Sequence, residues 1–369
     1  MLKVLFLVNI PAPYRIDFFN ELAKKCELTV LIEGNKASHR NDEWLNRSSI
    51  GFNAKYLTPR KYGKVYVCTD VKKYLTRDYD IIVIGVYNTP TSILAMHYMK
   101  SHSIPFVISV DGGYIKNENA LHKAFKTHLI GMAGAWLSPS RASDDYLKYY
   151  GAREEGIYRY PFTSLSQDDM SEAGGLQDKQ LLRSGLNIAE EKVVLSVGRF
   201  SYQNGYGKGY DTLMKAAEEL PDIGFYIVGD EPTEEFLNWK ESKKLGNVHF
   251  IGFQTKDEIK KYYGSADVFV LLTRGDVWGL VINEAMNYSL PVITTDKCVA
   301  GVELVENGVN GFLVSADDYT QTVESLKKIF ASDISEYGKN SRKTIQPYTI
   351  EKMAEKHIEI FGEIVNGRD

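Results

Sequence analysis

The sequence predicts a protein built from two doubly wound α/β domains, and three observations support this fold class. The chain has 369 residues, which is more than one compact core usually covers. Short apolar runs without polar alternation recur along it, as is typical of strands buried on both faces of a parallel sheet. Segments of helical periodicity separate these runs, so strands and helices alternate through two successive units.

In the first half, the apolar runs indicate the strands of one parallel sheet. These runs are KVLFLVNI (3–10), ELTVLIE (27–33), DIIVIGV (80–86), PFVISVD (105–111) and AWLSPS (135–140). YRIDFFNELAKK (14–25) and SILAMHYMKSH (92–102) between them have the spacing of amphipathic helices. The apolar run at the start ends at Pro11 and lacks a small-residue cleavage site, so we interpret it as a buried strand rather than a signal peptide. We place the first domain at residues 1–165.

A polar stretch that contains Gly-Gly, residues 163–190, interrupts this rhythm and is interpreted as a linker and an entry helix. The strand pattern then restarts in KVVLSVGRF (192–200), GFYIVGDE (224–231), VHFIGF (248–253), ADVFVLLT (266–273), LPVITTD (290–296) and GFLV (311–314). We place the second domain at residues 166–346. Residues 347–369 are predicted to form a last amphipathic helix that packs back on the first domain.

The composition is that of a soluble or peripheral protein, with a net charge of -4 and no apolar stretch near the roughly 20 residues that span a bilayer. Residues 1–160 carry 22 Lys and Arg against 15 Asp and Glu, and the remainder carries 22 against 33. A basic first half suits an anionic membrane surface or a charged glycan, and it also fits a plain spread of solvated lysines. Three cysteines in no paired spacing favour a reduced, cytosolic location.

The loop after the first strand of the second domain combines cations with glycines. Arg199 ends the strand, three glycines follow at 205, 207 and 209, and Lys208 stands just before a helix. Glycines let backbone amides approach a ligand, and a helix N-terminus attracts anions, so this loop suits a pyrophosphate. A flexible turn is the alternative interpretation, and the loop is not the dinucleotide-binding pattern of oxidoreductases.

Two carboxylates follow in RGDVWGLVINEAMNYSLPVI (274–293). Asp276 precedes a predicted helix and could simply cap it, whereas Glu284 lies within that helix. The helix is apolar on most sides, where an acid seldom lies without a partner, and the hydroxyl groups of a sugar would supply one. A solvated stripe formed by Glu284 with Asn283 and Asn287 is the alternative.

These motifs, together with GVELVENGVNGFLV (301–314), resemble the donor-binding half of the retaining family 4 glycosyltransferases, which have the GT-B fold. The resemblance covers residues 193–316, and in the first half it rests on layout and on PAPYRIDFF (11–19). It implies two Rossmann-like domains that face each other across a cleft. It also implies metal-independent transfer of a hexose-type sugar, without a cofactor, to a glycan or lipid-linked glycan acceptor in bacterial-type surface polysaccharide synthesis. The donor expected is a UDP-sugar, with a GDP-sugar possible.

By this resemblance, Arg199 and Lys208 would neutralise the donor diphosphate, Asp276 would face the transferred sugar, and Glu284 would bind the ribose. The remaining donor-binding positions implied are Val277, Trp278, the amides of Gly279 and Leu280, and, near the base, Gly252 and Phe253. The first acid is Asp where the family usually has Glu, and the spacing from Arg199 to Lys208 is longer than usual.

In the first domain, Asp111 and Gly112 follow a strand at the point where many relatives have a His that contacts the donor sugar. Asp111 is therefore a catalytic candidate and Gly112 a donor-binding one, although a tight glycine turn explains the segment equally well. Pro13, Tyr14 and Arg15 lie in a loop that faces the acceptor in relatives, and a rigid proline turn is the alternative. The helix around Lys123 and Lys126, which His122 and His128 flank, is the best candidate for touching a membrane on the cytoplasmic side.

Other sites are set aside. Asp78 and Asp80 form D-x-D, but they precede their strand, and no zinc-type ligand spacing occurs, so no metal site is predicted. A nucleotide-sugar epimerase of similar fold and a non-catalytic protein that binds nucleotide sugars or glycans remain as alternative functions.

Overall fold

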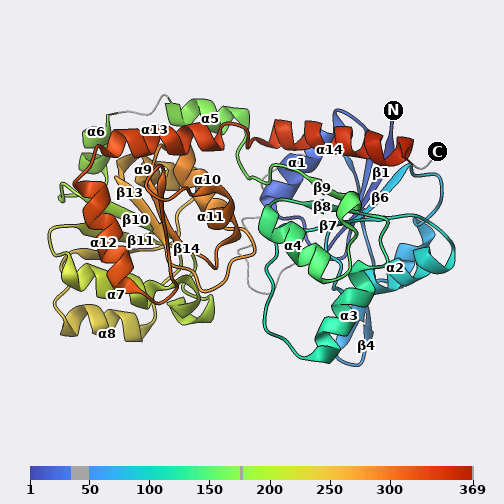
Figure 1. Cartoon of the computed structure of the whole chain (residues 1–369), viewed down its shortest axis with the longest axis horizontal. Coiled ribbons are helices and arrows are strands. Elements are labelled where there is room, and N and C mark those ends of the chain that lie inside the picture. The colour runs from blue at the N-terminus through green and yellow to red at the C-terminus, as the bar shows by residue number, and fades with distance from the viewer. Residues whose placement is uncertain (35–49, 175–177, 368–369) are drawn as a thin grey trace. The chain divides into compact units, whose positions relative to one another are not determined.

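The structure of the chain is a computed structural model that describes residues 1–34, 50–174 and 178–367. It divides into two compact units, the first formed by Met1–Ser164 with Tyr348–Asp369 and the second by Leu165–Pro347 (Figure 1). The chain therefore leaves the first unit once and returns to it with its last helix.

Within the described residues, the first unit is built on a seven-stranded sheet of order β3-β2-β1-β6-β7-β8-β9, in which every pairing is parallel. The strands are β1 (Lys3–Val8), β2 (Glu27–Ile32), β3 (Asn53–Tyr56), β6 (Ile81–Ile84), β7 (Val107–Ser109), β8 (Ala135–Ser138) and β9 (Ile157–Arg159). Val4 pairs with Leu28 on one side and with Ile81 on the other, so β1 is central. Its apolar side chains are buried on both faces.

The helices of this unit are α1 (Pro13–Ala23), η2 (Thr69–Lys73), α2 (Pro90–Ser101), α3 (Ala120–Ile130), α4 (Arg141–Tyr149), η3 (Glu154–Gly156) and α14 (Ile350–Asn366). Both α1 and α2 begin at a proline, whose fixed φ suits the first helical position. α14 packs against α1, with the rings of Phe18 and His357 4.7 Å apart. A two-stranded antiparallel hairpin, β4 (Arg60–Tyr62) with β5 (Val65–Val67), stands apart from the main sheet.

The second unit has, over its described residues, a six-stranded parallel sheet of order β12-β11-β10-β13-β14-β15. Its strands are β10 (Val193–Val197), β11 (Gly224–Val228), β12 (Val248–Ile251), β13 (Val268–Leu271), β14 (Val292–Thr295) and β15 (Gly311–Val314). This order reverses between β10 and β13. In doubly wound sheets, ligands bind beyond the carboxyl ends of the strands at such a reversal.

The second unit's helices are α5 (Gln167–Gly174), α6 (Lys179–Gly185), η4 (Gln203–Lys208), α7 (Tyr210–Glu219), α8 (Glu234–Ser242), α9 (Lys256–Ser265), α10 (Leu280–Asn287), α11 (Val299–Leu304), α12 (Tyr319–Phe330) and α13 (Ile334–Ile345). The stretch interpreted as a linker and one helix thus contains two helices, α5 and α6. The sequence pattern did not indicate β3, β9 or the β4–β5 hairpin. Searching the described part of the chain reveals no helix with the length and apolarity to traverse a bilayer.

Candidate active site

In the second unit, the loops that follow β10 and β13 meet at the carboxyl ends of these two neighbouring strands. The Nζ atom of Lys208, at the end of the first loop, lies 2.6 Å from Oδ2 of Asp276, in the second. Their side chains are only 16% and 19% exposed. The reversal of strand order thus brings together a cation and an acid that are 68 residues apart in the chain.

Arg199 lies at the start of the same loop, after β10, and it is exposed. Asp230, which follows β11, holds the loop by accepting from the backbone N–H groups of Phe200 and Ser201. The aliphatic stem of Lys208 lies over Gly198, where a Cβ would come within 3.3 Å of Lys208 Cγ. Both predicted cations therefore lie at the end of β10.

The turn between Lys208 and α7 depends on a glycine. Gly209 has φ +72°, and a Cβ there would lie 2.0 Å from the carbonyl oxygen of Leu272, so no other residue fits. Arg274 links the two loops, because its guanidinium binds both carboxylate oxygens of Asp211 at 2.7 and 2.8 Å while its backbone N–H donates to Gly207. Neither Arg274 nor Asp211 was predicted from the sequence, although Arg274 stands only two residues before Asp276.

The segment from Asp276 to Leu280 leads into α10, whose first amide groups have no partner within the helix. Gly279 precedes the helix with φ +103°, and a Cβ there would meet the sulfur of buried Cys298 at 2.7 Å. Leu280 is half-buried and Val277 is 55% exposed. Trp278 was expected among the donor-binding residues, but its side chain is only 2% exposed and donates to Asn283, so only its backbone can serve a ligand.

Glu284 is half-buried on α10, and one of its oxygens already has a protein partner. The hydroxyl of Tyr263, on α9, donates to Oε2 of Glu284 at 2.8 Å. Burial, and then the charge of Glu284, raises the pKa of Tyr263 far above its ordinary value, so this hydroxyl stays a donor. Tyr263 thus supplies one of the partners that a carboxylate on this largely apolar helix needs.

Gly252 and Phe253 follow β12, farther along the same carboxyl edge of the sheet. Phe253 is 51% exposed, although it is a large apolar residue. An exposed aromatic ring at the edge of a ligand site can stack against a planar base. The resemblance implies a contact of the backbone around Gly252 and Phe253 with the base, and the exposed ring would add a surface for stacking beside it.

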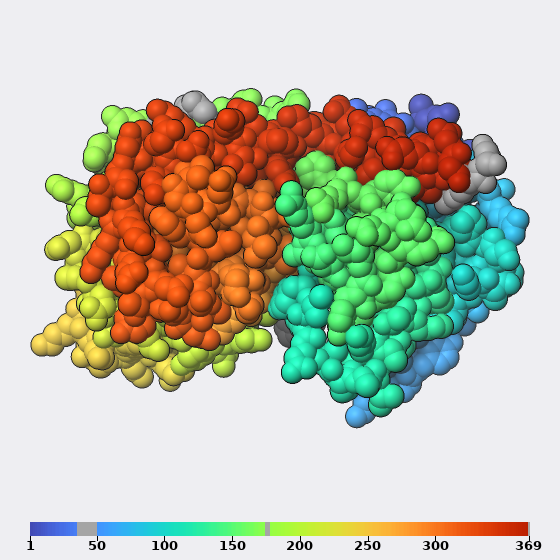
Figure 2. Space-filling model, in the orientation of Figure 1, coloured from blue at the N-terminus to red at the C-terminus, as the bar shows by residue number. Residues whose placement is uncertain are grey.

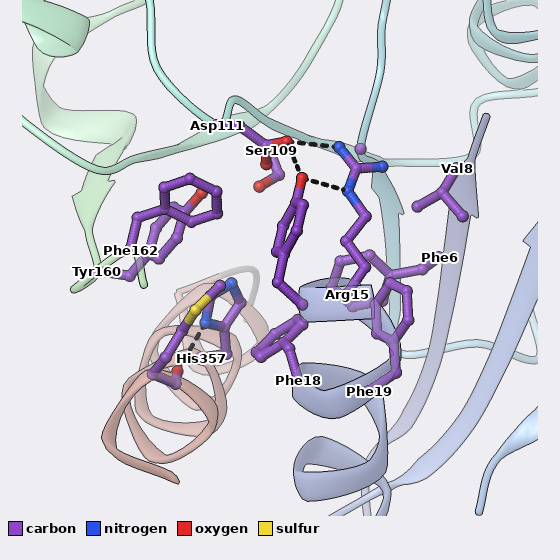
Figure 3. A pocket seen from close by; sticks show the side chains of 13 residues that line it. Phe6, Val8, Arg15, Phe18, Phe19, Ser109, Asp111, Tyr160, Phe162 and His357 are labelled. Atoms are coloured by element: carbon purple, nitrogen blue, oxygen red, sulfur yellow. Dashed lines mark hydrogen bonds and ion pairs between the residues drawn. The ribbon is translucent and has the colours of Figure 1, made fainter. Parts of the chain in front are cut away.

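In the first unit, three predicted residues form one hydrogen-bonded cluster (Figure 3). Arg15 Nη2 and the hydroxyl of Tyr14 both donate to Oδ2 of Asp111, at 2.6 and 2.7 Å, and Arg15 Nε donates to that hydroxyl at 3.0 Å. Tyr14 and Arg15 were assigned to the acceptor and Asp111 to the donor sugar. The structure places all three at the carboxyl ends of β1 and β7.

Burial and charge fix the protonation of this cluster. Burial, and then the negative charge of Asp111, raises the pKa of the Tyr14 hydroxyl, which therefore stays protonated. Burial alone lowers the pKa of Arg15, but Asp111 more than offsets it, so the pKa is raised. Among the side chains that the structure describes, Nη1 of Arg15 is one of the few buried polar atoms without a hydrogen-bond partner. It borders a cavity of about 20 Å³, enough for one water molecule.

The other residues of the first unit that the sequence analysis considered lie in turns, helix starts or contacts outside the Tyr14–Arg15–Asp111 cluster. Pro13 begins α1, and Gly112 has φ +142°, a conformation that favours glycine, so the turn interpretation of both segments is also satisfied. Asp80 precedes β6 and accepts from the N–H of Lys3, at the amino edge of the sheet and away from the Asp111 cluster. His128 contacts His97 of α2 rather than any predicted site residue, with their Nε2 atoms 3.1 Å apart.

The chain can now be compared with known proteins. Residues 178–351 match the family described as Glycosyl transferases group 1. An uncharacterised glycosyltransferase of Haemophilus influenzae is 32% identical over 48% of this chain and 50% of its own length. The lipopolysaccharide core biosynthesis glycosyltransferase LpsE of Rhizobium meliloti is 29% identical over 39% and 41%. The chain thus spans about half or less of the length of these relatives.

The solved structure of HepE from Anabaena in complex with UDP has a TM-score of 0.76 and 20% identity, covering 98% of this chain and all of that one. At this identity the likeness shows the fold alone. The expected fold class is therefore confirmed: the chain has the GT-B fold, and its residues 178–351 carry the sequence pattern of the group 1 glycosyl transferases.

Proposed function

We propose that this protein is a retaining, metal-independent glycosyltransferase that moves a hexose-type sugar from a nucleotide diphosphate sugar to a glycan or lipid-linked glycan. Supporting it are the match of the second unit to glycosyl transferases and relatives that include a lipopolysaccharide core glycosyltransferase. The UDP bound by HepE favours a UDP-sugar as donor, with a GDP-sugar as the alternative.

The observation that carries the proposal is the pair of Lys208 and Asp276 at the reversal of strand order, 2.6 Å apart. A sheltered cation and a sheltered acid are the two groups that a sugar diphosphate needs, one for its phosphates and one for its hydroxyls. In the structure these two groups form an ion pair with each other. A bound donor would separate them, so that the ammonium turns to the diphosphate and the carboxylate accepts from the sugar.

Breaking the sugar–phosphate bond leaves negative charge on the diphosphate and positive character on the sugar ring. Lys208, Arg199 and the first amides of α10 would stabilise the departing diphosphate, because preorganised donors at developing charge lower a barrier most. In this proposal these groups supply the positive charge that a metal ion supplies in metal-dependent transferases. In this proposal a phosphate oxygen takes the proton of the acceptor, on the same face of the sugar, so that the configuration is retained.

Glu284 would bind the ribose beside its contact with Tyr263, since a carboxylate can accept several hydrogen bonds at once. In the first unit, the Tyr14–Arg15–Asp111 cluster is the group of polar side chains that we assign to substrate contacts. Asp111 accepts from Arg15, and its side chain is 29% exposed against 10% for Arg15. It is therefore the group that we assign to substrate hydroxyls.

Thermal shift with UDP-, GDP-, ADP- and TDP-sugars identifies the donor, because a ligand at a hundred times its dissociation constant stabilises by about 2.7 kcal/mol. With that donor, Arg199→Ala and Glu284→Ala are expected to lose nearly all transfer. Arg199→Ala should keep the wild-type melting temperature, whereas Glu284→Ala should lower it modestly, because the buried hydroxyl of Tyr263 loses its acceptor. Lys215→Ala and Glu219→Ala, on exposed positions of α7, are the matched controls and should transfer normally. Full turnover in either site variant would remove the assignment.

The same incubation separates the other functions. An epimerase would convert the donor when no acceptor is present, which NMR of the recovered sugar nucleotide detects. A non-catalytic binding protein would be stabilised by the donor and would neither hydrolyse nor transfer it. Transfer that stops in the presence of EDTA would contradict metal independence, and an inverted anomeric signal in the product would contradict retention.

A further inference from the structure

The loop between β10 and α7 lies at the surface of the second unit. Its residues Ser201, Gln203 and Asn204 are exposed. In Figure 2 the yellow-green stretch to which this loop belongs, with the yellow α8 that follows it, forms the lower edge of the unit. A surface loop that contains several glycines needs contacts of its own to keep one path, so those contacts bear on the interpretation of this loop as a flexible turn.

Contacts at both ends fix the path of the loop. Near its start, the carboxylate of Asp230 accepts from the backbone N–H of Phe200, whose ring is buried. Near its end, the carbonyl oxygen of Gly207 accepts from the hydroxyl of Thr273 and from the backbone N–H of Arg274, both at 3.0 Å. These contacts favour a fixed loop over a flexible turn.

The side chain of Tyr202, which is half-buried, lies between this loop and the loop that follows β13. Its ring packs on Gly207, where a Cβ would lie 2.4 Å from Cδ1 of the tyrosine. Its hydroxyl donates to the carbonyl oxygen of Gly275 at 3.4 Å. The Nζ atom of Lys208 lies 5.5 Å from the centroid of the ring, within the range of a cation–π contact. Tyr202 thus contacts both loops of the candidate site and the cation of one of them.

The ammonium of Lys208 therefore has two partners of different kinds. The carboxylate of Asp276, at 2.6 Å, attracts it by its negative charge. The ring of Tyr202 attracts it through the electron density of its face and carries no net charge. A diphosphate would compete with the carboxylate for the ammonium, because both are anions. It would not compete with the ring, so the contact between Tyr202 and Lys208 can persist when a donor binds.

We propose that Tyr202 is a positioning residue, whose ring holds the ammonium of Lys208 at the donor diphosphate. The inference rests on the proposed function. Before the donor binds, the ion pair with Asp276 holds the ammonium in the site. After the diphosphate has drawn it away from Asp276, the ring keeps the flexible lysine side chain in place, so that its charge stays preorganised at the leaving group. Tyr202 acts through Lys208 and is assigned no contact with the sugar.

Two substitutions of Tyr202 separate its ring from its hydroxyl. Tyr202→Phe keeps the ring and should transfer within about twofold of wild type, whereas Tyr202→Leu keeps apolar bulk without a π face and should lower kcat/KM about tenfold. Tyr337→Leu is the matched control, because this half-buried tyrosine of α13 contacts Phe312 and should transfer normally. Melting temperatures show whether each variant folds. An equal loss in Tyr202→Phe and Tyr202→Leu would assign the effect to the hydroxyl and overturn the proposal.

A double-mutant cycle tests whether Tyr202 acts through Lys208. Isothermal titration with UDP, or with GDP if the thermal shift selects it, measures the affinity of each variant. In the wild-type background Tyr202→Leu should weaken this binding about fivefold. In the Lys208→Met background the same substitution should change it by less than about twofold, because the cation that the ring holds is gone. An equal loss in both backgrounds would mean that Tyr202 acts without Lys208, and the proposal would be wrong.

A spectrum recorded without any nucleotide tests the contact itself. Reductive methylation with ¹³C-formaldehyde labels the lysines and keeps their charge, and the Lys208 signal is identified by its absence in Lys208→Met. Because an aromatic ring shifts the signals of groups over its face, the Lys208 signal should move in Tyr202→Leu and stay in place in Tyr202→Phe. A signal that does not move in Tyr202→Leu would overturn the inference alone. A wild type that binds no nucleoside diphosphate would instead contradict the proposed function.

Discussion

The ammonium of Lys208 and the carboxylate of Asp276 form an ion pair, with their nitrogen and oxygen atoms 2.6 Å apart. Both side chains are largely sheltered, so each would be costly to leave alone. A donor that takes Lys208 for its phosphates must therefore displace Asp276, and the sugar hydroxyls must take up the acid. Donor binding at this site therefore includes a partner exchange, in which Lys208 leaves Asp276 for the diphosphate and Asp276 leaves Lys208 for the sugar hydroxyls.

Partner exchange predicts opposite effects of one substitution. Asp276→Asn removes the competitor for Lys208, so the nucleoside diphosphate without its sugar should bind about tenfold more tightly, equivalent to about 1.4 kcal/mol. Turnover of the complete donor should fall by about a hundredfold, because the sugar loses its acceptor carboxylate. Isothermal titration of the nucleoside diphosphate and a transfer assay measure the two quantities.

Lys208→Met is the complementary variant, and it should weaken both diphosphate binding and turnover. If Asp276→Asn also weakens binding of the nucleoside diphosphate, Asp276 does not compete with the diphosphate for Lys208. The predicted partner exchange would then be contradicted. Lys208→Arg keeps the charge and should retain part of both functions, which separates the loss of charge from a local change of shape.

The turn at Gly209 is predicted to be indispensable for the fold of the second unit. Gly209→Ala puts a Cβ 2.0 Å from Leu272 O in a backbone conformation that alanine disfavours. The expected result is a loss of several kcal/mol in the free energy of unfolding, since both a clash and strain are introduced. Gly246→Ala in the same unit has nothing within 4 Å and should stay near wild type in urea denaturation. Equal stability of the two variants would show that the turn relaxes freely.

Arg15 and Asp111 are predicted to have a larger coupling energy in a double-mutant cycle than ion pairs on the surface. Arg15→Met leaves a partly buried carboxylate without its main partner and should lower the free energy of unfolding by about 3 kcal/mol. Adding Asp111→Asn should recover part of that loss, giving a coupling energy on the order of 1–2 kcal/mol in a double-mutant cycle.

The matched surface pair is Lys356 and Glu359 on α14, at 2.9 Å with side chains 41% and 61% exposed. Lys356→Met with Glu359→Gln should give a coupling energy below about 0.5 kcal/mol. A coupling energy for Arg15 and Asp111 no larger than this would mean that the cluster is loosely held, and its role in placing Asp111 would be lost.

The strands of both sheets were predictable because burial on two faces leaves a signal in the sequence. Leu5 and Leu195 are each at most 1% exposed, within continuous apolar runs. The β4–β5 hairpin leaves no such signal, since five of its six strand residues are exposed and the sixth is only half-buried. β3 has one half-buried residue and β9 two, so neither gave an apolar run.

At the candidate site, the loops could be located from the sequence, but the side-chain contacts between distant residues could not. A cation or acid after a strand is visible in one segment, whereas Tyr14 with Asp111 joins positions 97 apart. That contact depends on the strand order of the sheet, in which only β6 separates β7 from β1, although β2 to β6 lie between them in the chain. Tyr263 was missed for the same reason, because nothing local links α9 to Glu284.

His357 makes the first unit sensitive to acid. This side chain is 1% exposed, and its ring packs against those of Phe18 and Tyr160, with centroids 4.7 and 4.6 Å away. Burial lowers the pKa of His357 from 6.5 to about 4. Between these values the unfolded chain takes up a proton that the folded unit refuses, so stability falls as the pH falls.

We therefore predict that His357 contributes stability that is fully present above pH 6.5 and is lost as the pH falls toward about 4. The loss over this window should be about 3 kcal/mol, from the size of the shift in pKa. His357→Phe keeps a ring among its aromatic neighbours but cannot be protonated, so its free energy of unfolding should depend less on pH. Urea denaturation of both proteins at pH 7 and pH 5 measures the difference. Carboxylates elsewhere titrate alike in both, so identical pH dependence would mean that His357 is protonated in the folded protein.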